Sequence, residues 1–182
     1  GVLPSCIVES EAETRLYHIG FKPGGTTRMD LFGGLCLSTD GGESFVRWSE
    51  APILERCRVN PFINTAPWVV PVADGYLMYY VAGLEWIHSD LPRYNIQIAR
   101  SADGFEWWRD GTGAVDFREG ENALARPYVV TEGGRYRMWF SAKGDAYRPF
   151  LAESEDGWHW DRTSDRTPLG PSPSGPDSEM VC

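Results

Sequence analysis

The chain has 182 residues, of which 42% are hydrophobic and 13% aromatic, so it is long enough for one domain with a sizeable core. Its 17 Lys and Arg against 26 Asp and Glu give a net charge of −9, which argues against nucleic acid or an anionic membrane as a partner, because both attract basic surfaces. No apolar run approaches the roughly 18 residues of a membrane span, so no membrane partner is expected.

A Ser-x-Asp-Gly sequence followed by aromatic residues occurs three times, at Ser38, Ser101 and Ser154, 63 and then 53 residues apart. Three runs rich in Val, Tyr, Trp and Phe precede each copy, and a short aromatic run follows it. In chain order the runs are 1–9, 15–21, 31–37 and 44–51, then 65–74, 75–83, 94–100 and 105–111, then 124–133, 135–144, 147–153 and 158–164. The pattern predicts a unit of four strands, roughly 55 residues long, repeated three times.

A four-stranded antiparallel unit repeated in series is typical of a β-propeller blade. We therefore predict an all-β fold, a single partial β-propeller domain over residues 1–182, with about three blades in this chain. The predicted blades are 1–57, 58–112 and 113–170, and 171–182 is predicted to start the next blade. Because propellers close with about four to eight blades, we expect further blades outside this chain.

The repeated turn has an architectural explanation. Asp and Ser side chains bond nearby backbone groups, and Gly supplies the positive φ of a tight hairpin. We therefore interpret Asp40, Asp103 and Asp156 as structural residues, although STDGGESF also fits the Asp-box pattern of sialidase-like propellers. The aromatic residues that follow the turns are predicted to be mostly buried between neighbouring sheets: Phe45, Trp107 and Trp160.

The chain resembles uncharacterised five-bladed propellers of the arabinanase, levansucrase and invertase type, which belong to the glycoside hydrolase superfamily of families 43, 32 and 68. The resemblance is carried, in order, by GVLPSCIV, YHIGF, LSTDGGESFVRWSEAPIL, ARPYVV, YRMWFS, AESEDGWHWDR and DSEM. It implies a five-bladed fold and three carboxylates on innermost strands that converge on a central funnel as nucleophile or base, stabiliser and general acid. The family motifs Arg-Asp-Pro and Glu-Cys do not occur, so no catalytic triad is carried over by motif.

The first strand of each blade lines a propeller axis, so its polar residues are the candidates for a catalytic site. Asp177 and Glu179 are two residues apart and would face the same side of a strand, where like charges repel unless they bind something or share a proton. Together with Glu121 they are the candidate catalytic residues. The alternative is that they are solvated loop charges.

Polar residues near the innermost strands and in two loops, 83–94 and 142–148, are candidates for binding a saccharide. Arg126 interrupts the apolar run LARPYVV and needs an anionic partner, which could be a substrate group, a carboxylate of the adjacent blade or a structural salt bridge. The candidate binding residues are Arg126, Asn122, Asn64, Asp145, Arg148 and Trp86, with Thr65 and Tyr147 in the same segments. We expect Glu121, Asn122, Arg126, Asp177 and Glu179 to gather at one end of the axis.

Two classes of function stay open. One is a glycoside hydrolase that uses carboxylate acid–base chemistry, active as the full-length protein and inactive as this piece; the other is a non-catalytic propeller that binds glycan or protein. The expected partner is a saccharide, and no cofactor or metal is expected, because the 3 His and 4 Cys lack metal-ligand spacing.

The sequence also bears on assembly and compartment. Exposed blade faces could pair two copies into a homodimer, although we favour a piece of a longer protein. No signal peptide is visible and no initiating Met is present, so the compartment stays open, with the cytoplasm slightly favoured.

Overall fold

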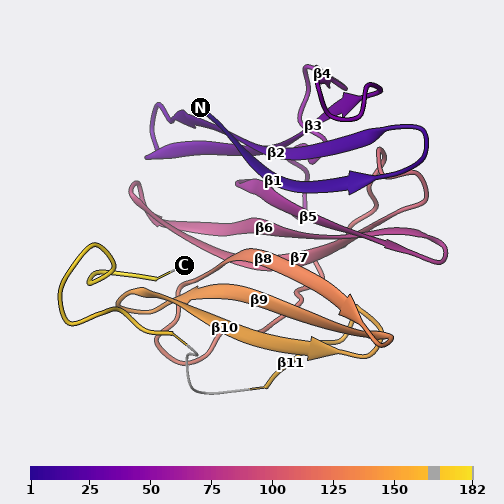
Figure 1. Ribbon diagram of the computed structural model, residues 1–182. Coiled ribbons are helices and arrows are strands. Elements are labelled where there is room, and N and C mark those ends of the chain that lie inside the picture. The colour runs from indigo at the N-terminus through magenta and orange to yellow at the C-terminus, as the bar shows by residue number, and fades with distance from the viewer. Residues whose placement is uncertain (164–168, 182) are drawn as a thin grey trace.

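The computed structural model describes residues 1–163 and 169–181 (Figure 1). Over these residues the chain is all-β, as predicted, and contains no helix that is long and apolar enough to cross a membrane. The strands in the described part of the chain are β1 (Val2–Glu9), β2 (Thr14–Pro23), β3 (Met29–Ser38), β4 (Val46–Arg47), β5 (Asn64–Val72), β6 (Gly75–His88), β7 (Leu91–Ser101), β8 (Ala123–Glu132), β9 (Arg135–Lys143), β10 (Tyr147–Ser154) and β11 (Asp161–Arg162).

The strands form three antiparallel groups that follow one another along the chain. Group one is β1–β4, group two is β5–β7 and group three is β8–β11, and within each group consecutive strands pair antiparallel. A single parallel pair links successive groups, Phe32 with Asn64 and Tyr94 with Ala123. Figure 1 shows the groups as stacked layers, violet, magenta to pink, and orange. Each group corresponds to one predicted repeat, while the residue boundaries of the blades stay a prediction.

The fourth strand of each repeat is shorter than predicted. β4 and β11 have two residues each, and in group two only the isolated pairs Arg100–Trp108 and Gln97–Gly113 occupy that position among the described residues. The late start of this fourth strand has a local cause: the Asp103 carboxylate accepts the backbone N–H groups of Phe105 and Glu106, so those two groups do not bond a neighbouring strand.

Two other segments differ from expectation. Residues 83–94 are not a loop, as the sequence suggests, but extend β6 and β7 as a hairpin whose last pair is His88 with Leu91. Two register irregularities let this hairpin twist as it leaves the sheet. Residues 175–181, expected to begin an innermost strand, contain none; the Val181 N–H donates to the Tyr147 carbonyl of β10 at 3.1 Å.

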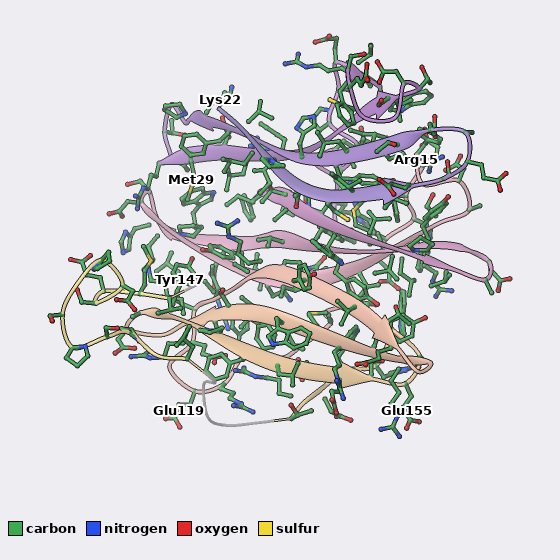
Figure 2. The ribbon with its side chains drawn as sticks, in the orientation of Figure 1. Arg15, Lys22, Met29, Glu119, Tyr147 and Glu155 are labelled. Atoms are coloured by element: carbon green, nitrogen blue, oxygen red, sulfur yellow. The ribbon has the colours of Figure 1, made fainter. Side chains whose placement is uncertain are left out.

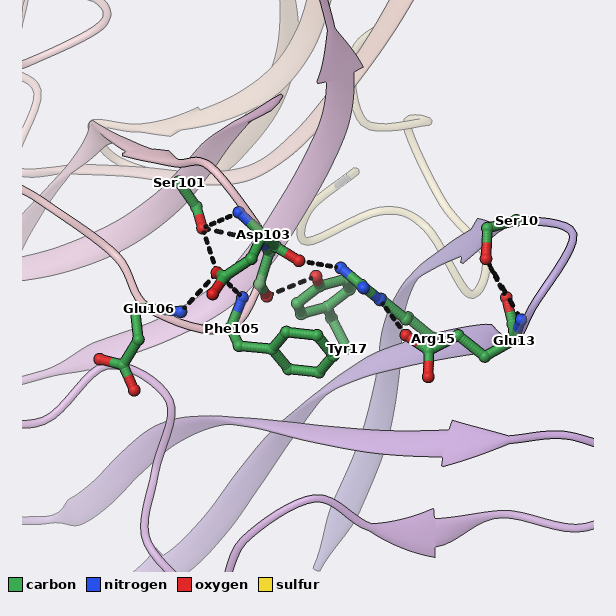
Figure 3. A network of polar contacts seen from close by, with 9 residues as sticks. Ser10, Glu13, Arg15, Tyr17, Ser101, Asp103, Phe105 and Glu106 are labelled. Atoms are coloured by element: carbon green, nitrogen blue, oxygen red, sulfur yellow. Dashed lines mark hydrogen bonds and ion pairs between the residues drawn. The ribbon is translucent and has the colours of Figure 1, made fainter. Parts of the chain in front are cut away.

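The Ser-x-Asp-Gly turns close on themselves, which confirms their structural role. In group two the Ser101 hydroxyl donates to the Asp103 carboxylate at 3.0 Å and accepts the Gly104 N–H at 2.7 Å (Figure 3). Asp103 also accepts the N–H groups of Phe105 and Glu106, at 2.8 and 3.0 Å. The same Ser–Asp bond recurs at Ser38–Asp40 and Ser154–Asp156. Hydrogen bonds hold the pKa of each carboxyl below its ordinary value, chiefly from the His159 ring at Asp156, from Ser38 and Ser44 at Asp40, and from the backbone N–H groups at Asp103.

Each of the later two turns is also bound to the preceding group by a buried tyrosine. The Tyr17 hydroxyl on β2 donates to the Gly104 carbonyl at 2.9 Å, and the Tyr79 hydroxyl on β6 donates to the Gly157 carbonyl at 2.7 Å. Arg15 reinforces the first contact, since its guanidinium donates to the Asp103 carbonyl and lies 4.1 Å from the Phe105 ring centre (Figure 3). The turn motif therefore connects neighbouring groups as well as neighbouring strands.

The aromatic residues after the turns are half-buried, which is less than predicted. Trp107 packs edge-on against Tyr17, with ring centres 6.4 Å apart, and Trp160 against Tyr79 at 5.3 Å. Phe45 is also half-buried but joins none of the hydrophobic clusters of the described residues, because no described group precedes group one to receive it.

The hydrophobic core lies between the groups. One cluster joins group two to group three and includes Tyr79, Ile98 and Met138; a second joins group one to group two and includes Tyr17 and Leu35. Alternate residues of each strand enter these layers, as expected for stacked sheets. This stacking aligns the first strands of the groups, so that β1 contacts β5 and β5 contacts β8.

Candidate functional site

The first strand of every group is interrupted at a proline. The register shifts between Pro4 and Cys6 in β1, between Thr65 and Trp68 in β5, and between Ala125 and Tyr128 in β8. In β5 and β8 the extra residue precedes the proline and has a left-handed backbone: Ala66 with φ 50° and Arg126 with φ 56°. Such bulges redirect a side chain, and a left-handed residue other than Gly is costly, so the fold has to maintain both.

The bulges open onto a pocket of about 320 Å³ that receives side chains from all three groups. We call it the axial pocket. Its apolar wall comes from β1, β2, β3, β5, β6 and β8, with Met180 near the C-terminus, and its polar side chains are Thr65, Tyr94, Arg126, Ser141 and Tyr147. Figure 2 shows Met29 and Tyr147, both pocket residues, at the end of the sheets where the β2–β3 and β9–β10 turns lie. The Ser-x-Asp-Gly turns lie at the opposite end of their strands.

Arg126 is the one charged side chain among the described lining residues. It is exposed, and no carboxylate in residues 1–163 or 169–181 forms an ion pair with it. The carboxylate partner that the sequence led us to expect from an adjacent blade is therefore not found within the described chain. Beside it, the hydroxyl groups of Tyr94 on β7 and Tyr147 on β10 are hydrogen-bonded to each other. As far as the structure describes it, the pocket combines apolar walls, hydroxyl groups and one cation without a counter-charge.

Glu121, a predicted catalytic residue, forms a structural ion pair away from the axial pocket. Arg162 on β11 donates to both of its carboxylate oxygens, at 2.8 and 2.9 Å, and the Arg118 N–H adds a third bond at 2.9 Å. Both side chains are nearly covered, with 11% and 8% exposed. Burial opposes the charge on Glu121, but the bonds from Arg162 and Arg118 outweigh it and lower the pKa of the carboxyl.

Of the two predicted substrate-binding amides, the Asn64 side chain is bonded to the backbone, whereas for Asn122 the bond is made by its main-chain N–H. Asn64 is fully buried and donates to the carbonyls of Glu55 and Asn60, at 3.2 and 3.1 Å. The Asn122 N–H donates to the Lys143 carbonyl at 2.9 Å. Both amides leave a buried Oδ1 without a partner among the described residues, yet neither lines the axial pocket.

Asp177 and Glu179 differ in their surroundings. Asp177 accepts a 2.7 Å hydrogen bond from the Ser172 hydroxyl in the C-terminal segment. Glu179 is exposed and has no ion pair with a described residue, and it immediately precedes Met180, which lines the axial pocket. Of the three predicted catalytic carboxylates, Glu179 is the one adjacent in sequence to a pocket residue.

Two further predicted binding groups lie outside the axial pocket. Asp145 and Arg148 form an exposed bidentate ion pair, with the shorter N–O distance 2.5 Å, and the bond from Arg148 lowers the pKa of Asp145 to about 2. Trp86 is half-buried on the β6–β7 hairpin and lines a separate pocket with Asp30 and Arg56. The two pockets share Met29 and Ile63 in their walls, so Trp86 lies next to the axial pocket rather than in it.

Sequence reasoning identified Arg126 but missed Tyr94 and Ser141. Both residues lie in runs that look like ordinary sheet strands, in which the facing direction of one residue depends on register. A signal was available in the paired sequences TAPW and ARPY, each at the same place in its repeat. Within the described residues, no group of three His, Cys, Asp or Glu side chains is placed to hold a metal ion.

Known proteins were compared with this chain in sequence and in structure. No family model matches it. Two Mycobacterium tuberculosis proteins, "Uncharacterized protein Rv1502" and "Uncharacterized protein MT1551", are 34% and 33% identical to it over 183 aligned residues. The alignments cover the whole chain, which spans 61% of the length of either relative.

Solved structures share its fold over nearly the whole chain. A "Glycoside hydrolase" aligns with TM-score 0.78 and 18% identity, and the alignment covers 99% of this chain and 59% of that protein. A thermostable family-43 glycoside hydrolase aligns with TM-score 0.70 and 20% identity, and the alignment covers 97% of this chain and 59% of that protein. The Bombyx mori GH32 beta-fructofuranosidase BmSUC1 aligns with TM-score 0.68 and 16% identity, and the alignment covers 87% of this chain and 36% of that protein. The fold is that of the propeller glycoside hydrolases. The resemblance seen in the sequence is thereby confirmed at the level of the fold, and the axial pocket lies beside the first strands of the three groups, of which β5 contacts both β1 and β8.

Proposed function

We propose that the protein is a carbohydrate-active propeller of the glycoside hydrolase type and that the axial pocket is its saccharide site. The observation that carries the proposal is the convergence of side chains from all three groups on one pocket at the bulged prolines. Its composition suits a sugar, because apolar and aromatic surfaces contact the C–H face of a ring, while hydroxyl groups and Arg126 bond its polar edge. A solved structure of the same fold, a complex of BT0996 with RGII, adds support for a saccharide ligand.

For catalysis we propose Glu179 as a general acid or base. It is exposed, free of an ion pair in the described chain and next to Met180 of the pocket wall. Asp177, two residues earlier in the same segment, is the second carboxylate in this proposal, and further carboxylates would come from blades outside this chain. Glycoside hydrolysis needs two carboxyl groups, one to protonate the leaving oxygen and one to act at the sugar ring or on water.

Binding and hydrolysis measured together test this proposal. The chain and the longest protein encoded by its gene are titrated with oligosaccharides and assayed on aryl glycosides. We expect sugar binding by both, hydrolysis only by the longer protein, and loss of hydrolysis with retained binding in Glu179→Gln. Hydrolysis that is unchanged in Glu179→Gln removes its catalytic role, and absence of binding to any sugar contradicts the proposed function.

A non-catalytic glycan-binding role is the second candidate. One observation favours it: no carboxylate lines the axial pocket among the described residues. In that case the longer protein would bind the same sugars as this chain and hydrolyse none of them. The assay above separates the two roles directly.

A further inference from the structure

We propose that the axial pocket selects a saccharide that carries an oxyanion group, a carboxylate or a phosphate, and that Arg126 is the residue that recognises it. This inference rests on the proposed function and narrows it to a class of ligand. Arg126 is the one charge among the described lining residues and has no carboxylate partner in residues 1–163 or 169–181. The guanidinium offers a planar fork of donors that matches a carboxylate or phosphate in two-point contact.

The left-handed backbone of Arg126 recurs at the same place in group two, whereas its long cationic side chain does not. Ala66 occupies the same place in β5, before the proline of the same bulge, with nearly the same φ of 50° against 56°. Both residues line the axial pocket. An alanine therefore satisfies this backbone, and the bulge alone does not account for a long cationic side chain in group three.

The surroundings leave the positive charge of Arg126 for a ligand. The pocket wall beside it is apolar, and its other polar members, Thr65, Tyr94, Ser141 and Tyr147, are neutral. Elsewhere in the described chain arginines facing acidic neighbours are paired, for example Arg148 with Asp145 and Arg162 with Glu121. Since the whole chain carries a net charge of −9, its overall field repels anions, so an anionic ligand has to be held by this local contact.

Four proteins and three sugars test the inference. Calorimetric titrations compare methyl galactopyranoside, its 6-carboxylate analogue and galactose 6-phosphate on the wild-type chain, Arg126→Ala, Arg126→Lys and Arg135→Ala. Arg126→Ala reproduces the residue found at position 66. Arg135→Ala is the matched control, because it removes an exposed arginine whose partner, Glu155, lies at the opposite end of the molecule from Tyr147 (Figure 2).

We expect the wild-type chain to bind at least one of the two anionic sugars about tenfold more tightly than the neutral sugar, the scale of one charged hydrogen bond. Arg126→Ala is expected to abolish this preference and leave the neutral sugar within about twofold, Arg126→Lys to keep part of it, and Arg135→Ala to keep all of it. The tighter of the two anions identifies the oxyanion. Circular dichroism and the thermal midpoint establish that each variant is folded.

Two other outcomes overturn the inference and are distinguishable. Equal binding of neutral and anionic sugars by the wild-type chain, or a preference that survives in Arg126→Ala, refutes oxyanion recognition by Arg126 while the saccharide site stands. Failure of these three sugars and of the oligosaccharides of the preceding test to bind refutes the saccharide site itself, and this inference with it.

Discussion

Glu121 accepts two hydrogen bonds from the guanidinium of Arg162, which lies 5.1 and 4.8 Å from the ring centres of Phe140 and Phe150. In sequence Glu121 is an acidic residue at the entrance to an innermost strand, which suggested catalysis. In the fold it neutralises a covered arginine and links the loop before β8 to the last strand of group three. At this scale the partner of a charged residue shows what that residue stabilises, and the catalytic role of Glu121 stays a prediction.

Replacing Glu121 with Gln is expected to destabilise the chain by about 2–4 kcal/mol at neutral pH, because Arg162 is left covered without a counter-charge. The folded-state pKa of Glu121 is lowered, so the stabilisation is present above the unfolded-state pKa of about 4.3 and is lost as pH falls through the folded-state value. The difference between wild type and variant should therefore shrink on acidification. Urea unfolding from pH 7 to pH 3 measures it.

Glu119→Gln is the control for this measurement, because Glu119 is exposed and has no ion pair in the described chain. Its effect should stay within about 0.5 kcal/mol at every pH. Equal losses for both variants, or a Glu121→Gln loss that does not change with pH, would contradict the structural role of the ion pair.

The turns and bulges are the elements that define this fold. Each of the later two Ser-x-Asp-Gly turns presents a glycine carbonyl to a tyrosine of the preceding group, and each later first strand bends at a proline to direct one residue to the axis. The Ser-x-Asp-Gly turns and the proline bulges lie at opposite ends of the sheets. One end therefore maintains the stacking of the groups and the other is left for a ligand.

Gly157→Ala should cost about 1–3 kcal/mol more than Gly133→Ala. Both glycines have positive φ, 75° and 59°, so backbone strain is common to the two variants. A Cβ at position 157 would meet Leu77, Tyr79 and Tyr136 at 3.0–3.2 Å, whereas at position 133 it meets nothing within 4 Å. Thermal or chemical unfolding gives both values, and equal costs would show that the turn does not pack tightly on group two.

Trp107→Ala is expected to destabilise the chain by about 3 kcal/mol, and Phe45→Ala by less than about 1 kcal/mol. The two residues occupy the same place in their repeats, but Trp107 packs on Tyr17 and the core between groups one and two, while Phe45 joins no cluster of the described residues. The comparison therefore measures the contact between groups, because both substitutions remove an aromatic side chain and only Trp107 makes that contact. Similar losses at both positions would argue against stacking through the turn motif.

For the whole molecule, stacking leaves apolar residues on the outer face of group three. Tyr128 and Trp139 are cross-strand partners, 49% and 39% exposed, at the register position that Trp68 and Tyr79 occupy in group two. In group two the hydroxyl of Tyr79 donates a hydrogen bond to the Gly157 carbonyl in the turn of group three. Exposed aromatic pairs of this kind promote association.

We therefore expect the isolated chain to associate as its concentration rises, and Trp139→Ser to reduce this association. Trp108→Ser is the control, since Trp108 is 56% exposed on another part of the surface. Light scattering over a range of concentrations measures the effect. A chain that stays monomeric throughout, or one whose association responds equally to both substitutions, would exclude this face.

The repeat and its turns could be predicted from sequence because their causes are local. The bonds of Ser101 and Asp103 span two to three residues, so the motif alone specifies them. The late start of the fourth strands follows from the same bonds, although the aromatic runs after the turns suggest longer strands. Among the site residues, Arg126 could be identified because a charge in an apolar run is conspicuous, whereas Tyr94 resembles any strand tyrosine.

By itself the sequence determined that the chain is all-β, that it repeats, and where its turns lie, since alternation and turn chemistry act between near neighbours. Only the tertiary structure decided which polar residues meet. Glu121 and Arg162 are 41 residues apart, Tyr94 and Tyr147 are 53 apart, and Tyr17 and Gly104 are 87 apart. Those pairings depend on how whole groups stack and on the bulges that turn Ala66 and Arg126 toward the axis. A one-residue change of register would turn every side chain of a strand to the opposite face of its sheet.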